Sequence, residues 1–227
     1  MMPKTGVRLL LIDTCGSEGT VALAEAERVV ASETLPGRSA SERLVPVVRG
    51  MMSAAGWRLG ELAAIVVVHG PGSFTGVRVG LSAAKGLSEA GGVGLVAVSR
   101  LALLAAAAGD VAGEVCAVLD AGRGEFYCGV YAGKNCVREA LLTAEEVAVA
   151  AAGAGAVVVC EERVAEALSS LGPRMVREPR AEDAAPLAVE RVRVGEFDDV
   201  ATLDANYLRR TDAEIFAKPK VSAGIVK

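Results

Sequence analysis

The sequence predicts an α/β protein built from two similar halves, each containing strands and helices. Along the 227 residues, short apolar runs rich in β-branched residues alternate with stretches of helical periodicity. A unit of strand, terminal Asp, glycine turn and returning strand also occurs twice, first around Asp13 and again around Asp120. Two copies of one unit favour two related halves that face each other. Strand–Asp–glycine turns are common in proteins, so a chance likeness is the alternative.

The elements of the first half follow from these patterns in chain order. We expect an antiparallel meander, a helix after a capping loop, two buried strands and two further helices. The predicted strands are Val7–Asp13, Thr20–Glu25, Val29–Leu35, Leu62–Val68 and Val93–Val98, and the predicted helices are Ser41–Ala55, Phe74–Glu89 and Leu101–Ala108.

The second half repeats the meander and then gives a weaker signal. We place the domain boundary between residues 109 and 110, which gives halves 1–109 and 110–227. The tail from Thr211, with Lys218 and Lys220, has no periodic pattern and is expected to fray or to be ordered by a partner. The predicted strands are Val115–Asp120, Phe126–Tyr131, Val137–Leu142 and Ala156–Cys160, and the predicted helices are Thr143–Ala151, Arg163–Leu171 and Ala184–Val194.

Composition excludes several classes of protein. A hydrophobic content of 52% excludes general disorder. A net charge of −4 argues against a protein that grips a nucleic-acid backbone alone. The longest uncharged stretch, Leu62–Val77, contains glycine and proline, so we expect no membrane span. The N-terminus runs from a short basic lead straight into a strand-like segment, with no long apolar region before a small-residue cleavage site, so we expect no signal peptide. The five cysteines form no C-x-x-C pair, which favours reduced thiols and a cytoplasmic setting.

A glycine-rich loop, His69–Arg78, lies between a predicted buried strand and a predicted helix. Glycines at such a place let backbone N–H groups approach a phosphate. The spacing nevertheless matches neither the P-loop nor the dinucleotide-binding fingerprint. His69 is the chain's one histidine, and its glycine neighbour favours a structural role over catalysis.

The same loop opens a helix on which Gly76, Gly80 and Ala84 recur at i, i+4 and i+8. Such a stripe of small residues lets another helix approach closely. It would form a partner-docking face together with apolar residues of the preceding helix. The alternative is that the stripe packs against the chain's own sheet. The predicted docking residues are Leu44, Val47, Val48, Met51, Thr75, Gly76, Val77, Gly80, Leu81 and Ala84.

Asp13 and Asp120 end their strands beside glycine turns. In a fold of two halves that clamps a nucleotide, such carboxylates hold a metal–phosphate, whereas elsewhere Asp at a turn is only a cap. We therefore describe a set of vestigial phosphate loops, which comprises Asp13, Gly16, Gly70, Gly72, Asp120 and Gly122.

The chain resembles the TsaB (YeaZ) family, the dimerisation subunit of the bacterial machinery that makes threonylcarbamoyladenosine in tRNA. The likeness covers about Val7 to Tyr131, and the GPGSFTGVR-x-G segment is its most specific part. The segments that carry it read LLLIDTCGSEGTVALAE, SASERLVPVV, HGPGSFTGVRVGLSAAKGL and VLDAGRGEFYCGVY. Ala40 departs from the family, since many members have a histidine at this position.

The resemblance implies an actin-like/Hsp70-like (ASKHA) fold of two RNase-H-like halves, with mixed sheets and flanking helices. It also implies docking through Ser41–Ala55 and Phe74–Glu89 onto a TsaD-like catalytic subunit, with a TsaE-like ATPase and tRNA in the same complex. ATP and metal are expected on those partners and no cofactor on this chain. Whether the chain forms a homodimer when alone is left open.

The resemblance implies a non-catalytic scaffold that activates a TsaD-type subunit for threonylcarbamoyl transfer to adenosine in tRNA. The catalytic sibling binds metal through an H-x-x-x-H pair, which a chain with one histidine cannot build. The alternative is an ASKHA-fold nucleotide-binding phosphotransferase or ATPase that uses Asp13 and Asp120. A homodimeric chaperone-like or peptidase-like protein is a third hypothesis.

Overall fold

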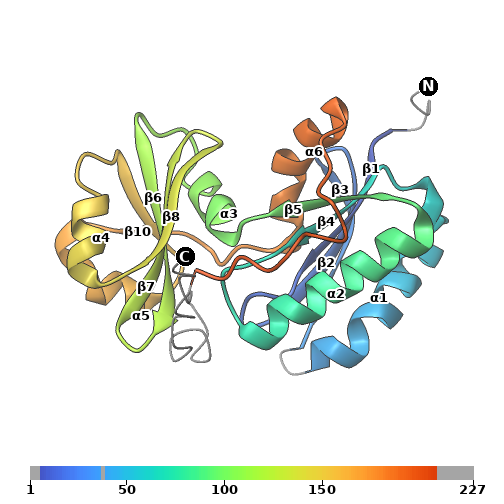
Figure 1. Ribbon diagram of the computed structural model, residues 1–227, viewed down its shortest axis with the longest axis horizontal. Helices are drawn as coiled ribbons and strands as arrows, with labels where there is room; N and C mark the ends of the chain where they lie inside the picture. Colours follow the sequence, from blue (N-terminus) through green and yellow to red (C-terminus); the bar gives the residue numbers. More distant parts are fainter. Residues whose placement is uncertain (1–5, 37–38, 209–227) are drawn as a thin grey trace, which may run out of the picture.

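The computed structural model describes residues 6–36 and 39–208. Two five-stranded sheets lie side by side, one in each half of the molecule, as Figure 1 shows. Helix α3 (Arg100–Ala106) follows the last strand of the first sheet and lies between the two sheets. The predicted α/β architecture of two halves is therefore confirmed.

The first sheet has the strand order β3-β2-β1-β4-β5. The first three strands form the predicted antiparallel meander, whereas β4 pairs in parallel with both β1 and β5. The strands are β1 (Arg8–Asp13), β2 (Gly19–Glu25), β3 (Arg28–Leu35), β4 (Ala64–Val68) and β5 (Gly94–Val98).

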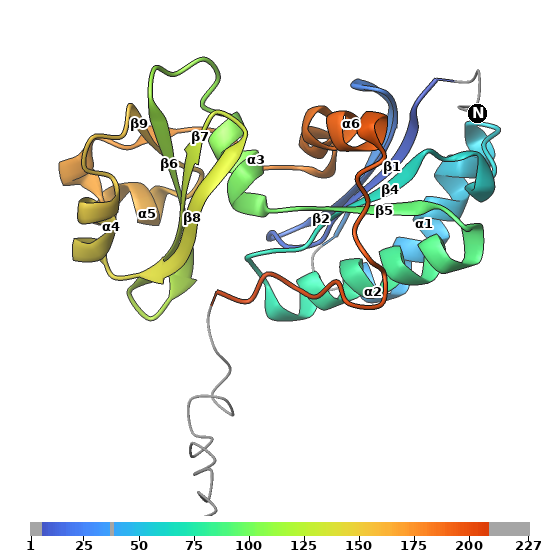
Figure 2. The ribbon, with the colours of Figure 1, turned by 45° about the horizontal axis from the view of Figure 1, so that its top comes forward.

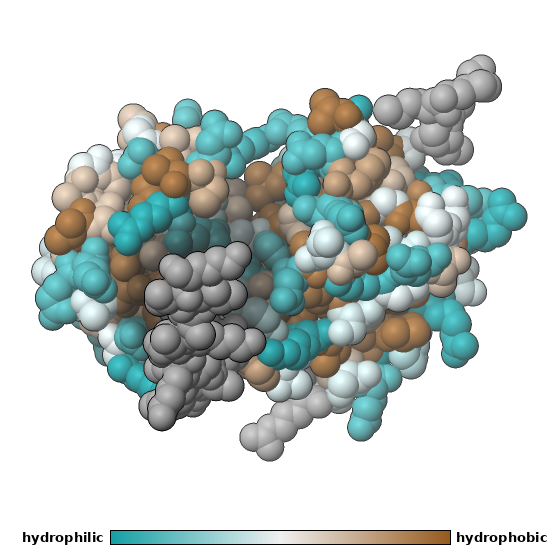
Figure 3. All heavy atoms as spheres, in the orientation of Figure 1, coloured by the Kyte–Doolittle hydropathy of each residue, from teal (hydrophilic) through white to brown (hydrophobic). Residues whose placement is uncertain are grey.

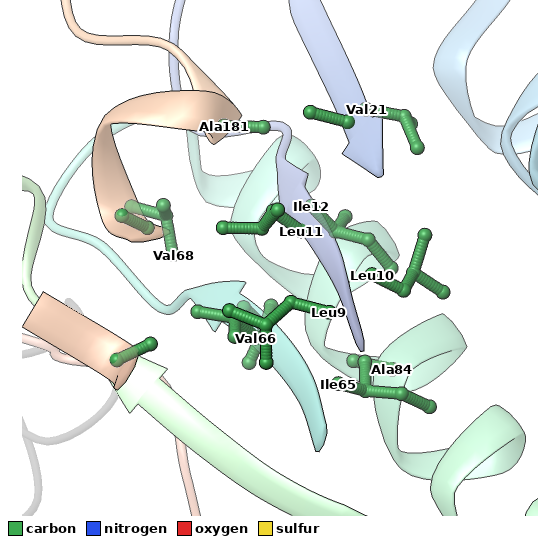
Figure 4. Close-up of a cluster of buried hydrophobic side chains, with 14 of the residues drawn as sticks. Leu9, Leu10, Leu11, Ile12, Val21, Ile65, Val66, Val68, Ala84 and Ala181 are labelled. Carbon is green, nitrogen blue, oxygen red and sulfur yellow. The ribbon is translucent and has the colours of Figure 1, made fainter. Parts of the chain in front are cut away.

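Helices cover both faces of this sheet (Figure 2). Helices α1 (Ala40–Ala54) and α2 (Phe74–Gly91) pack on one face. The short helix η4 (Ala181–Ala184) and α6 (Ala185–Val194) pack on the other. Leu9–Ile12 of β1 and the whole of β4 are consequently apolar, as is typical of strands buried on both faces. Figure 4 shows their side chains packed together with Ala84 and Ala181.

The second sheet has the order β10-β9-β6-β7-β8. On one face lie α4 (Ala144–Ala150) and α5 (Glu162–Ala167), and on the other lies α3. Two further short helices are η2 (Leu59–Glu61), which precedes β4, and η3 (Ser169–Leu171), which follows α5. The strands are β6 (Glu114–Gly122), β7 (Glu125–Ala132), β8 (Asn135–Leu142), β9 (Ala156–Val159) and β10 (Arg174–Met175).

The internal repeat is confirmed by topology. Each sheet consists of an antiparallel meander whose first strand pairs in parallel with a fourth strand, which pairs in turn with a fifth. Asp13 ends β1, and Asp120 lies near the end of β6, the equivalent strand. The predicted elements agree with the structure to within a few residues, although β10 was not expected.

The chain returns to the first half near its C-terminal end. Helix η4 contacts β1, β2 and β4, and α6 contacts β4 and β5, although both helices follow the second sheet in sequence. The domain boundary at residues 109 and 110 stays a prediction, but residues 181–194 add their apolar side chains to the core of the first half. The tail with Lys218 and Lys220 lies outside the described residues. Within the described ranges, no helix is long and apolar enough to cross a membrane.

Candidate functional site

The glycine loop packs its backbone against the turn between β1 and β2. Ser73 N donates to the carbonyl oxygen of Cys15 over 2.9 Å, and Thr14 Oγ1 donates to the carbonyl oxygen of Gly76 over 2.6 Å. A Cβ at Gly76 would clash with the carbonyl oxygen of Thr14, and one at Gly72 would clash with that of Cys15. These glycines therefore serve close packing of two backbone segments within the chain.

The predicted docking face of α1 and α2 is mostly turned inward. Gly80 faces the hydroxyl group of Thr14. Val47 is half-buried and Thr75 is exposed. The partner-binding role of this set stays a prediction, but in the single chain the first sheet already covers most of it. The buried apolar members are Leu44, Val48, Met51, Val77, Leu81 and Ala84.

A different set of residues forms the outward side of the two helices. A shallow groove of about 390 Å³ follows the start of α2 and reaches the first turn of α1. Its lining includes Phe74, whose surface is 57% exposed. In Figure 3, hydrophobic and hydrophilic residues are interspersed over this part of the molecule. The residues that line the groove are Ser41, Phe74, Thr75, Arg78, Val79 and Ser82.

An aromatic and cationic cluster lies at the start of α2. The Arg78 guanidinium carbon lies 3.1 Å from the Phe74 ring centroid and 4.9 Å from the Tyr207 ring centroid. The two rings are 6.1 Å apart. A guanidinium held over aromatic rings is a favourable cation–π arrangement. Phe74 and Tyr207 both remain partly open to solvent.

A second pocket, of about 420 Å³, opens where the β1–β2 turn meets the first turns of α1 and α2. Its lining includes the hydroxyl-bearing residues Thr14, Ser17, Ser73 and Thr75. The predicted loop residue Gly16 also lines it, whereas Gly70 and Gly72 do not belong to its lining. Gly70 has a φ of 108°, and its carbonyl oxygen accepts a hydrogen bond from Arg100 N over 2.8 Å.

Asp13 is paired inside the protein. Its side chain is 2% exposed, its Oδ1 accepts a hydrogen bond from Cys15 N over 2.8 Å, and its Oδ2 lies 3.8 Å from Arg100 Nε. Burial raises the pKa of Asp13, although Arg100 and the Cys15 N–H act in the opposite direction. The Asp13 carboxylate is therefore held by the chain itself.

Glu178 completes this cluster from the other half of the molecule. Its Oε1 lies 2.6 Å from Arg100 Nη2 and accepts from Ser17 N over 3.2 Å, while Oε2 accepts from Ser17 Oγ over 3.1 Å. Burial would raise the pKa of Glu178, but the hydrogen bonds and charge of Arg100 lower it below its ordinary value. Neither Arg100 nor Glu178 was predicted from the sequence, although a single Arg at the start of the apolar helix α3 is a visible signal for a buried cation.

Asp120 has a different environment. Its Oδ2 pairs with Arg163, and its Oδ1 accepts a hydrogen bond from Gly122 N over 3.0 Å. The Arg163 side chain is 73% exposed. Asp120 thus caps its own turn, as the simpler interpretation of the sequence suggested. The two predicted phosphate-loop carboxylates have different arginine partners.

His69 links the loop to the returning chain. Its Nδ1 lies 3.2 Å from the carbonyl oxygen of Asp204, and its own carbonyl oxygen accepts a hydrogen bond from Asn206 N over 2.8 Å. These contacts give the single histidine a structural role. Among the described residues, no group of three or more His, Cys, Asp or Glu side chains is placed to hold a metal ion.

A third pocket, of about 490 Å³, lies beside this histidine between the two halves. Glu139 accepts hydrogen bonds there from Ser99, from Asn206 over 2.5 Å and from Tyr131. Burial and the Glu139 charge raise the pKa of Tyr131 far above its ordinary value, so this hydroxyl stays protonated. This cluster was not predicted from the sequence, because its members are far apart along the chain.

Comparison with known proteins gives consistent matches. The family model for TsaD, tRNA N6-adenosine threonylcarbamoyltransferase, matches residues 32–156. The tRNA threonylcarbamoyladenosine biosynthesis protein TsaB of Bacillus subtilis is 34% identical over 143 residues, which are 63% of this chain and 62% of that protein. The match thus spans less than two thirds of this curated relative.

Two further matches separate the branches of this group. A tRNA N6-adenosine threonylcarbamoyltransferase of Ruegeria is 43% identical, but over only 30% of this chain and 19% of its own length. YeaZ from Pseudomonas aeruginosa, a solved structure, is 32% identical with a TM-score of 0.73 and covers 88% of this chain and 99% of its own. The fold, the family motifs and this match along nearly the whole chain agree, and the chain belongs to the TsaB (YeaZ) family.

Proposed function

We propose that this chain is a non-catalytic subunit that binds and activates a TsaD-type catalytic subunit for threonylcarbamoyl transfer to adenosine in tRNA. The observation that carries the proposal is the match with YeaZ along nearly the whole chain, whereas the transferase family model matches residues 32–156 and the Ruegeria transferase matches 30% of the chain. Because the chain has one histidine, it cannot supply a pair of metal-binding histidines. The proposal places ATP and metal on the partner subunits and no cofactor on this chain.

The proposed docking surface is the outward side of α1 and α2. Gly50 and Gly86 lie inside these helices, are exposed, and would meet no atom within 4 Å if a Cβ were added. A glycine inside a helix costs about 0.5–1 kcal/mol relative to Ala. Nothing in the described part of the chain packs closely enough on these glycines to require them. Close approach of a partner helix would explain both.

Aromatic anchors flank this surface. Arg78 and Tyr207 are of residue types that supply much of the binding energy at protein interfaces. The Arg78 guanidinium already lies over the exposed Phe74 ring. A TsaE-like ATPase and tRNA would join through the assembled complex. This agrees with a chain of net charge −4, which is poorly suited to hold tRNA alone. A cytoplasmic location, where tRNA is modified, is part of the proposal.

The alternative, a nucleotide-binding phosphotransferase or ATPase, is less well supported. It requires Asp13 to face a bound metal–phosphate, but Asp13 is buried beside Arg100. Asp120 is likewise engaged with Arg163. Nucleotide binding by the isolated chain, lost in Asp13→Ala and Asp120→Ala, would favour this alternative.

The docking surface is tested with Ser82→Arg, because Ser82 is exposed and lines the groove. The matched control is Ala148→Arg, which adds the same side chain to an exposed position of α4 in the second half. We expect the Ser82 variant to bind the TsaD-type subunit at least about tenfold more weakly in calorimetry, a loss of about 1.4 kcal/mol. The control should bind like the wild type. Equal binding by the two folded variants would show that the partner docks elsewhere.

A further inference from the structure

The carboxylate of Glu178 is surrounded as a bound anion would be. It follows β10, in the segment that crosses from the second sheet to η4, and reaches the β1–β2 turn of the first half. There it accepts one backbone N–H and one hydroxyl group from Ser17, and it contacts Arg100 Nη2 over 2.6 Å. A backbone donor, a hydroxyl donor and a guanidinium are also the groups that proteins use to bind phosphate.

Arg100 is the fixed part of this arrangement. It is 5% exposed, and its Nε has no hydrogen-bond partner among the residues that the structure describes. This Nε lies 3.8 Å from Asp13 Oδ2, beyond hydrogen-bond distance, so the charge of Asp13 balances that side of the guanidinium, while Nη2 faces Glu178. The site thus has a built, desolvated cation at its base.

Gly16 brings the backbone of the turn against this pair. A Cβ at Gly16 would clash with both Arg100 Nη2 and Glu178 Oε1. A side chain at this position would displace the Arg100–Glu178 ion pair from the turn, and the glycine leaves room for it. The missing side chain gives the Glu178 carboxylate direct access to the turn backbone.

We infer that the turn from Asp13 to Ser17 is a phosphoryl-binding cradle, and that Glu178 is its built-in occupant. In the native chain the carboxylate takes the donors that a phosphate would need, and its negative charge repels phosphate. The chain consequently binds neither inorganic phosphate nor the phosphates of a nucleotide at this turn. Because Glu178 comes from the other half of the molecule, the same contact also ties the two halves together.

The inference is tested by emptying the cradle in the full-length chain. Glu178→Ala removes the occupant, whereas Glu178→Gln removes only its charge and keeps the space filled. Glu18→Ala is the matched control, because it deletes one exposed carboxylate from the same turn. The probe is inorganic phosphate, titrated calorimetrically against chloride at equal ionic strength. Far-ultraviolet circular dichroism checks the fold of each variant.

We expect saturable phosphate binding by Glu178→Ala, at least about tenfold tighter than any binding by the wild type, Glu178→Gln or Glu18→Ala. Binding by the wild type at this turn, or equal binding by the Gln and Ala variants, would overturn the inference. So would a folded Ala variant that binds no phosphate.

A second variant, with a smaller polar residue at this position, keeps the test informative if the alanine variant does not fold. Glu178→Ser offers a hydroxyl group to Arg100 and should bind phosphate as the Ala variant does. If neither variant folds in chloride, phosphate added during refolding should restore the fold, since it replaces the missing anion, and failure of this rescue would contradict the inference. Binding to the TsaD-type subunit is measured in a separate experiment, so failure of the phosphate test does not count against the proposed function.

Discussion

The two strand–Asp–turn units begin from the same pattern and end in different surroundings. Asp13, in the first half, is buried with Arg100, and the glycine loop and Glu178 close over its turn. Asp120, in the second half, pairs with an arginine that is mostly in solvent. The comparison teaches that a repeated motif preserves the backbone path, whereas the chemistry of each copy is set by segments that pack on it from elsewhere.

The largest difference between the copies should appear on removing their arginines. Arg100→Leu leaves Asp13 as a buried carboxylate without its cation, so we expect a loss of about 3–5 kcal/mol in the free energy of unfolding. Arg163→Leu removes the solvent-exposed partner of Asp120 and should cost at most about 1 kcal/mol. Urea denaturation of both variants measures the two losses. Equal losses would show that the two turns are energetically alike.

A smaller effect is expected where the glycine loop meets the first turn. A methyl group at Gly76 would clash with the carbonyl oxygen of Thr14, so Gly76→Ala should lower the free energy of unfolding by about 1–3 kcal/mol. On the same helix, a Cβ at Gly86 meets open space, and Gly86→Ala should stabilise the isolated chain by about 0.5–1 kcal/mol. Thermal denaturation compares the two. Stabilisation in both would mean that α2 does not pack on Thr14.

The smallest expected effect is the pH dependence of the Glu178 contact at the first turn. The pKa of Glu178 is lowered from 4.5, so its contribution to stability is present above that value and is lost as pH falls through the folded-state pKa. Wild type should therefore be more stable than Glu178→Gln at neutral pH, by at most about 1 kcal/mol because the side chain is 44% exposed. The difference should vanish in acid. Asp13, whose pKa is raised, titrates in both proteins and largely cancels from the comparison.

Denaturation midpoints of these two proteins between neutral pH and pH of about 3 measure the effect across the ordinary carboxyl range. Glu18→Gln is the control for loss of one carboxylate. A wild-type advantage that grows towards acid would contradict the assignment of this contact.

Local patterns predicted most of the secondary structure, and the repeat predicted the shared topology of the two sheets. The strands could be predicted because Leu9–Ile12 of β1 and the whole of β4 are apolar, as befits strands buried on both faces of a sheet. The packing of α6 on the first sheet could not be predicted from the sequence. Helix α6 resembles any amphipathic helix, and the sheet on which it packs depends on contacts distant in sequence.

The candidate site was harder to predict for a related reason. The stripe of Gly76, Gly80 and Ala84 indicates close packing without indicating on what, and here Thr14 and the first sheet occupy it. Glu178 and Arg100 meet across the two halves, and no local pattern encodes that meeting. Gly50 and Gly86, which are exposed, are the residues that could indicate the proposed docking surface. A search for apolar residues at helical spacing does not find them, because glycine adds no hydrophobicity to either helix face.

The most direct test of the account is the mass of this chain, alone and mixed with the TsaD-type protein of the same organism, measured by light scattering. A nucleotide titration of the isolated chain accompanies it. The account predicts a stable heteromer and no nucleotide binding by this chain alone. Absence of a heteromer, together with micromolar nucleotide binding by the isolated chain, would contradict it and favour an enzyme of the same fold.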